Sequence, residues 1–266
     1  MSSDIEPDRA PDAPHPRETT DFIGHDALEQ AFLAAYRSGR IHHAWLIAGP
    51  EGVGKATLAY RMARFLLAFD RPGAPAASPQ RDLAVPPDHP VARRIAAGAH
   101  PNLFVLRRQE NPDRQNGFTS DIPIAFVRKA ADFFATSAAE PGWRIAIVDS
   151  ADDLNIRSAN ALLKLIEEPP RQSLFLIVAH TLGRVLPTIR SRCRILKAGP
   201  LEDADLERIL AGLNVEIADR AGVLSSARGS VRRALAAAAG DLTSVRAQIQ
   251  ALLQGPEPAS VLAFAE

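Results

Sequence analysis

A glycine-rich stretch that ends in a lysine carries the clearest chemistry in the sequence. "GPEGVGK" places Gly49, Gly52 and Gly54 ahead of Lys55, between an apolar run and a segment with helical spacing. Glycines let backbone N–H groups curl around phosphate oxygens, the next helix offers its positive N-terminus, and the lysine reaches the terminal phosphates. The alternative is a strand-to-helix turn that binds nothing. The pattern predicts a phosphate-binding loop.

Two positions depart from what an active nucleotide hydrolase needs. Ala56 stands where a hydroxyl would bind magnesium, and the next side chain, Thr57, is turned away by about 100°. Asp149 ends the run "RIAIVD", as a magnesium-binding aspartate would, with a simple turn residue as the alternative. Ser150 replaces the glutamate that polarises water, a loss on the order of 10²–10⁴ in rate. We expect at most weak ATP binding, magnesium only together with nucleotide, and little or no hydrolysis.

Other residues leave alternatives open. An active hydrolase would have to use Thr57 with Asp152 or Asp153 in place of the missing groups. The basic turn "IRSRCR", which contains Arg192, is either a solvated surface or the source of an arginine finger for a neighbouring subunit, worth about 10³–10⁵ in rate. Arg232, near the start of a later helical segment, is either a surface charge or a contact to the phosphates. Cys193 has no orienting partner for nucleophilic catalysis.

The composition is typical of a soluble globular protein. The 266 residues are 46% hydrophobic and 23% charged, and 31 lysines and arginines balance 31 aspartates and glutamates. No net field draws the chain to nucleic acid or membrane, and no apolar run is long enough to span a bilayer. A single cysteine indicates a reducing compartment. We therefore expect a cytoplasmic protein without a membrane partner.

Apolar runs and helical patterns alternate along the chain. Strands are expected at 44–48, 102–106, 144–149 and 173–179, and helices at 56–68, 123–138 and within "SANALLKLIEEPP". The alternation predicts an α/β domain with a parallel sheet over 21–199. Residues 1–20 are predicted to be a disordered tail and not a signal peptide, and 70–90 a proline-rich insertion. A small helical lid domain is expected over 200–241, with the start of a further helical domain at 242–266.

The ordered set of motifs resembles the bacterial clamp-loader family of AAA+ proteins, and within it the delta-prime group of DNA polymerase III. The resemblance rests on "DFIGHDALEQAF", "HHAWLIAGPEGVGKATLAYRMARFLL", "HPNLFVL", "DSADDLNIRSANALLKLIEEPP", "LPTIRSRC" and "GSVRRAL", over residues 21–240. It implies an AAA+ P-loop domain and membership in a heteropentamer with delta and three gamma/tau subunits. That assembly places the sliding clamp on primed DNA as part of the DNA polymerase holoenzyme.

The resemblance also assigns roles to individual residues. It implies that Arg192 completes a neighbouring ATPase site in trans, that Arg232 is the sensor-2 arginine, and that His180 or Thr181 lies at sensor 1. Ala56 and Ser150 fit the degenerate delta-prime group better than the alternative, an active gamma/tau-like motor.

Two departures from the family remain. Residues 69–100 hold no cysteine, so the zinc module of many relatives is not expected. Too few residues follow Gly240 for the family's helical collar, so we expect a truncated product.

Overall fold

The computed structural model describes residues 6–10, 13–70, 81–111, 117–136, 140–217 and 219–240. In chain order the elements are α1 (Asp26–Arg37), β1 (Ala44–Ala48), α2 (Lys55–Phe69), α3 (Pro90–Ala96), β2 (Leu103–Arg107), α4 (Ile124–Ala135), β3 (Arg144–Asp149), η1 (Ala151–Asp153), α5 (Ile156–Glu167), β4 (Ser173–Ala179), η2 (Leu182–Arg184), α6 (Pro187–Arg190), β5 (Arg194–Lys197), α7 (Asp203–Gly212), α8 (Arg220–Ala227) and α9 (Val231–Ala238). The strands form one sheet in the order β2-β3-β4-β1-β5, and every neighbouring pair is parallel. The predicted α/β class with a parallel sheet flanked by helices is confirmed.

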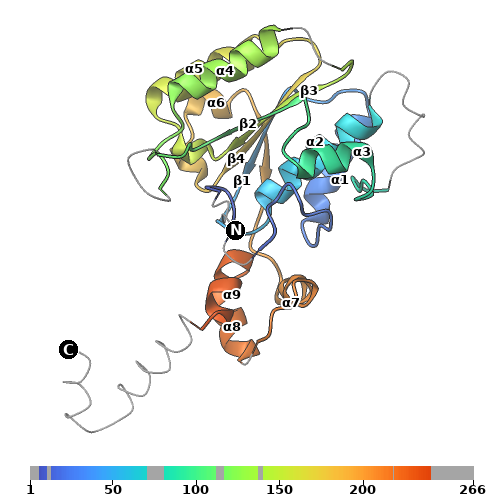
Figure 1. Ribbon diagram of the computed structural model, residues 1–266, viewed down its shortest axis with the longest axis vertical. Helices are drawn as coiled ribbons and strands as arrows, with labels where there is room; N and C mark the ends of the chain where they lie inside the picture. Colours follow the sequence, from blue (N-terminus) through green and yellow to red (C-terminus); the bar gives the residue numbers. More distant parts are fainter. Residues whose placement is uncertain are drawn as a thin grey trace, which may run out of the picture.

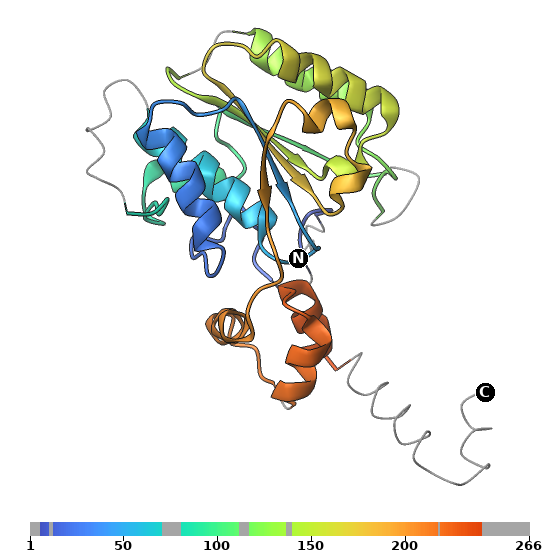
Figure 2. The same cartoon turned by 180° about the vertical axis from the view of Figure 1, so that it is seen from behind.

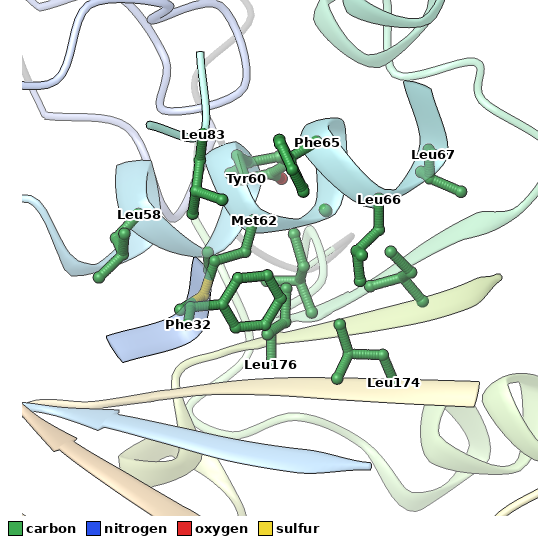
Figure 3. Packing of buried hydrophobic residues seen from close by; sticks show 14 of the residues in the cluster. Phe32, Leu58, Tyr60, Met62, Phe65, Leu66, Leu67, Leu83, Leu174 and Leu176 are labelled. Carbon is green, nitrogen blue, oxygen red and sulfur yellow. The ribbon is translucent and has the colours of Figure 1, made fainter. Parts of the chain in front are cut away.

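Helices cover both faces of the sheet, as Figures 1 and 2 show. Alternate residues of each strand point to opposite faces, so Trp45 and Ile47 of β1 pack with α1 and α2, whereas Leu46 packs with α4, α5 and α6. Figure 3 shows the first of these cores, where Phe32 of α1 and Met62 of α2 lie over Leu174 and Leu176 of β4. The sheet therefore has a separate apolar core on each face.

The central strands β1, β3 and β4 have the bounds that the sequence predicts, because they are buried on both faces and read as continuous apolar runs. The strand predicted at 102–106 lies one residue later. The sequence does not indicate β5, which is a sheet edge with an exposed Arg194, Ile195 and Lys197. Charged side chains are usual on such edges, and they hide the strand pattern.

Three helices follow the sheet domain. α7, α8 and α9 enclose a small apolar cluster that includes Leu206, Leu210 and Leu235. Gly199 and Pro200, the predicted domain boundary, lie between β5 and α7. The division into domains stays a prediction, and the predicted segment 242–266 lies outside the described residues. Among the residues that the structure describes, none of the helices combines the length and the apolar character needed to cross a bilayer.

The first twenty residues, predicted to be disordered, make many contacts where the structure describes them. We call residues 6–10 and 13–20 the N-terminal strap. His15 is fully buried, Arg17 donates to the Ala96 carbonyl at 3.0 Å, and the buried Arg64 of α2 donates to the Arg17 carbonyl at 3.0 Å. Charged groups hold the strap in place of apolar ones, which is why its composition suggests disorder.

The predicted insertion at 70–90 is described only in part. Residues 71–80 lie outside the described ranges. Within 81–90, Leu83 and Val85 are buried in the core beside α1 and α2, and α3 begins at Pro90.

Candidate functional site

The glycine-rich loop joins β1 to α2 at the carboxyl edge of the sheet. Gly52 and Gly54 have φ values of +78° and +94°, a region that other residues rarely adopt. A Cβ on Gly49 would lie 1.9 Å from the Ala198 carbonyl oxygen, so the loop passes directly against the chain that leaves β5. Three glycines are therefore required by the backbone itself, and the loop has the strand–loop–helix context of a phosphate cradle.

A cavity of about 550 Å³ opens over this loop. Lys55, Ala56 and Thr57 line it from the start of α2, together with the N-terminal strap, α7 and α9. Ala56 also packs against the core and brings no oxygen to the cavity. Thr57 lines the cavity as well, one position further along the helix. The volume falls in the range of small-molecule sites.

Lys55 is buried, and its Nζ donates to the Pro50 carbonyl of the same loop. Burial lowers the pKa of Lys55 to about 8, an effect that the nearby Asp149, Asp152 and Glu51 carboxylates partly offset. The ammonium thus lies against its own loop, and it is the only lysine among the described residues that line the cavity.

Asp149 ends β3 and reaches the same cavity. Burial of its carboxyl group, reinforced by the neighbouring Asp8, raises the pKa of Asp149 to about 7, although Lys55 opposes the shift. Ser150 is buried, with its hydroxyl 3.4 Å from the Asp153 carboxylate. The pair in the position of a metal ligand and a base is therefore a carboxyl group whose pKa lies near neutral pH and a serine.

Asp152, an alternative source of a carboxylate, is already engaged. Its two oxygens accept hydrogen bonds from the backbone N–H groups of His180, at 2.6 Å, and Thr181, at 2.9 Å. These bonds tie η1 to the end of β4. The His180 ring lines the cavity, and its buried Nδ1 has no partner. Burial, followed by the Lys55 charge, lowers the pKa of His180, so the ring is neutral at pH 7.

The start of α9 packs directly on the glycine-rich loop. Val231 N–H donates to the Gly52 carbonyl, and Ser230 Oγ donates to the Glu51 carbonyl, each at 2.9 Å. A Cβ on Gly52 would lie 2.4 Å from Ser230 Oγ. Arg232 forms an ion pair with the Glu51 carboxylate. Arg232 thus lines the cavity, and its guanidinium is paired with the loop.

Arg192 lies away from this cavity. It precedes β5, and Arg194 pairs in register with Trp45 near the beginning of β1, whereas the glycine-rich loop follows the end of β1. Arg192 donates to the Thr188 carbonyl in α6, at 3.1 Å, and pairs with Glu167 of α5 at 2.9 Å. Its side chain is 41% exposed. The structure therefore separates Arg192 from the chain's own loop by the height of the sheet.

Sequence reasoning missed the contribution of the strap to the cavity. Asp8 lines it, with a side chain that is only 2% exposed. Its Oδ1 pairs with Arg107 at 2.7 Å, while Oδ2 is buried without a partner. Arg107 is the register partner of Asp149 at the sheet edge. Two features of the sequence could have indicated this contact. The first twenty residues have more acidic than basic side chains, and an arginine directly follows the strand "LFVL".

Two other kinds of site, a cysteine nucleophile and a metal centre, find no support among the described residues. Burial raises the pKa of the Cys193 thiol to about 12, so it is not an activated nucleophile. Among the described residues, no group of three or more histidine, cysteine, aspartate or glutamate side chains could hold a metal ion.

Comparison with known proteins places this arrangement in a family. A family model described as "DNA polymerase III, delta subunit" matches residues 24–202. The chain is 35% identical over 162 residues to DNA polymerase III subunit delta' of Pseudomonas aeruginosa, a match that covers 61% of this chain and 44% of the relative. For the Escherichia coli K12 subunit of the same name, identity is 29% over 171 residues, covering 64% and 46%. The chain spans less than half the length of these relatives.

More distant similarity extends to gamma subunits. DNA polymerase III subunit gamma/tau of Mycobacterium tuberculosis H37Rv is 29% identical over 178 residues, which is 66% of this chain and 28% of the relative. Among solved structures, a gamma subunit-related protein of Thermotoga maritima superimposes with a TM-score of 0.50 at 16% identity, over 87% of this chain and 62% of that one. Together with the parallel sheet, these findings confirm the predicted α/β AAA+ fold class.

Proposed function

The chain belongs to the family of DNA polymerase III delta-prime subunits, members of the clamp-loader proteins, and we propose that within a clamp loader it assists a neighbouring ATPase instead of hydrolysing ATP itself. Arg192 is the group that acts in trans. The proposed partners are gamma/tau and delta subunits, with the sliding clamp and primed DNA reached through the complex.

The position of Arg192 is the observation that carries the proposal. Its guanidinium is exposed and held from two elements, by the Thr188 carbonyl of α6 and the Glu167 carboxylate of α5. An exposed ion pair of this kind contributes about 0.2–1 kcal/mol, so it orients the side chain and still yields to a polyphosphate. Arg192 lies at the opposite edge of the sheet from its own loop, which supports a role at another subunit's nucleotide and not at its own.

The chain's own cavity supports the proposal that this chain does not hydrolyse ATP itself. Its volume and its glycine-rich loop fit a nucleotide. The residues fit magnesium poorly, since Ala56 has no oxygen and burial raises the pKa of Asp149 to about 7. A water-activating carboxylate is also missing at Ser150, so we derive no hydrolytic step here.

A gamma/tau-like motor is the alternative function. It would need Thr57 to bind the metal and Asp152 to polarise water. Both Asp152 oxygens already accept backbone hydrogen bonds, which counts against that role. ATP turnover by the purified chain alone tests this alternative directly: appreciable turnover would favour the motor.

The proposed role of Arg192 is tested in a clamp loader reconstituted with the complete subunit. Arg192→Ala is expected to lower ATP turnover at the adjacent site by about 10³-fold or more, with nucleotide affinity there nearly unchanged. Arg184→Ala provides the matched control, because Arg184 is also exposed and its substitution removes the same charge. Equal turnover by the Arg192→Ala and wild-type complexes would refute the proposal.

A further inference from the structure

The strap brings a buried carboxylate to the cavity over the glycine-rich loop. Asp8 Oδ1 accepts hydrogen bonds from Arg107 at 2.7 Å and pairs with His15 Nε2 at 3.2 Å. His15 Nδ1 accepts the Arg17 backbone N–H, so the ring proton lies on Nε2 and points to Asp8. Both partners use the same oxygen. Asp8 Oδ2 is left buried and unpartnered in a side chain that lines the cavity.

The anchoring of the strap fixes where this carboxylate lies. Arg107 is opposite Asp149 in the register of β2 and β3, at the carboxyl edge of the sheet. It also binds Glu6, at 2.8 Å, and Glu6 in turn binds Arg17 at 2.6 Å. Glu6 does not line the cavity, whereas Asp8 does. One arginine thus holds two strap carboxylates, and only one of them faces the site.

The positive groups of the cavity are already engaged. The three arginines that line it within the described ranges each pair with a carboxylate, as seen in the pairs Arg232–Glu51, Arg108–Asp153 and Arg208–Asp205. Lys55 donates to a carbonyl of its own loop. A polyphosphate that enters would meet arginines that already have carboxylate partners, together with the Asp8 carboxylate, whose Oδ1 is paired with Arg107 and whose Oδ2 has no partner. Such a charge interacts strongly in a poorly solvated site.

We propose that Asp8 is a specificity-determining residue of this cavity, and that through its negative charge it selects against nucleotides in proportion to their phosphate charge. The inference rests on the part of the proposed function that treats the cavity as a nucleotide pocket. It does not depend on the role of Arg192. Adenosine experiences little of this repulsion, ADP more, and metal-free ATP most, because the Coulomb energy scales with the charge of the ligand.

Asp8→Asn is the informative variant. The asparagine Oδ1 keeps an acceptor for Arg107 and His15, although without the ion pair, and its Nδ2 takes the place of the unpartnered Oδ2. Equilibrium dialysis with labelled adenosine, ADP and ATP, in EDTA, measures the three affinities on the purified full chain. The variant is expected to bind ATP about tenfold or more tightly than the wild type, ADP by a smaller factor, and adenosine equally.

Glu6→Gln is the matched control. It removes the same charge from the same strap, and Glu6 also pairs with Arg107, but Glu6 does not line the cavity, so the ATP-to-adenosine ratio should stay close to that of the wild type. A thermal melt of each variant checks that the fold is kept. Added salt should weaken the discrimination by the wild type, because screening acts on charge and not on shape.

Two results would overturn the inference. In one, Asp8→Asn changes the affinities for adenosine and ATP by the same factor, which indicates a steric effect. In the other, Asp8→Asn binds ATP no better than the wild type, including the case in which neither binds. The proposed action of Arg192 is measured on the partner's turnover, so it would survive either result.

Discussion

The packing of α9 on the glycine-rich loop leads to a prediction about Gly52. Gly52→Ala forces a left-handed conformation on a residue with a side chain, which costs about 1–2 kcal/mol. Its Cβ would also lie 2.4 Å from Ser230 Oγ and 2.7 Å from Arg232 Cβ, so α9 must move. That movement breaks the Val231–Gly52 and Ser230–Glu51 hydrogen bonds, at about 0.5–1.5 kcal/mol each. The loss of the two hydrogen bonds therefore adds about 1–3 kcal/mol to the conformational cost of Gly52→Ala.

Gly39 supplies the reference for this comparison. It also has a positive φ, +66°, but a Cβ there would meet nothing within 4 Å. Gly39→Ala therefore destabilises the protein only through the left-handed backbone conformation. Hydrogen exchange at the Val231 amide isolates the difference, because this N–H is bonded to the loop. Its protection should fall by about 5–150-fold more in Gly52→Ala than in Gly39→Ala. Equal protection in the two variants would show that α9 is not held on the loop in solution.

Two further predictions concern single carboxyl groups. Glu167→Ala should reduce turnover at the adjacent site of the reconstituted loader by a few-fold, from the ~0.2–1 kcal/mol of its pair with Arg192. The neighbouring exposed Glu168→Ala should have no effect, and in an Arg192→Ala background Glu167→Ala should add nothing; an additive loss would contradict the positioning role. Asp149 has a pKa raised to about 7, so the folded state keeps a proton that the unfolded state loses above pH ~4. Folding stability should therefore fall as pH rises from about 4 to 7. Asp149→Asn should remove that dependence, as urea midpoints measured at pH 5 and pH 8 would reveal; a wild-type slope retained in the variant would refute it.

The parts of the fold that the sequence predicts are those with a local signal. Strands buried on both faces leave continuous apolar runs, as in "RIAIVD", and the glycine-rich loop has a fixed spacing that its own backbone requires. β5 escapes prediction because an edge strand can place charges on its exposed face. The seven-residue helix α3 lies next to a run of prolines, whose composition points to irregular structure.

The parts of the site that the sequence does not predict depend on charge pairs between distant segments. Arg107 and Asp8 are 99 positions apart, and Arg232 and Glu51 are 181 apart. Nothing in either local sequence selects these partners over other carboxylates. Residue type left Arg232 open between a surface charge and a contact to the phosphates, whereas the three-dimensional arrangement reveals that it binds the loop, and that strap residues such as Pro7 and Asp8 line the cavity.

The register of β5 against β1 has a consequence for how such chains can associate. The basic turn before β5 and the nucleotide cavity lie at opposite edges of one sheet. The proposed action of Arg192 in trans needs the edge of one sheet that carries the basic turn to face the cavity edge of a neighbouring sheet. Repeated along a row of subunits, such a contact is head-to-tail, and it gives the assembly a direction. The function we propose would place this chain at one end of an open row, where it needs a neighbour on its basic side only.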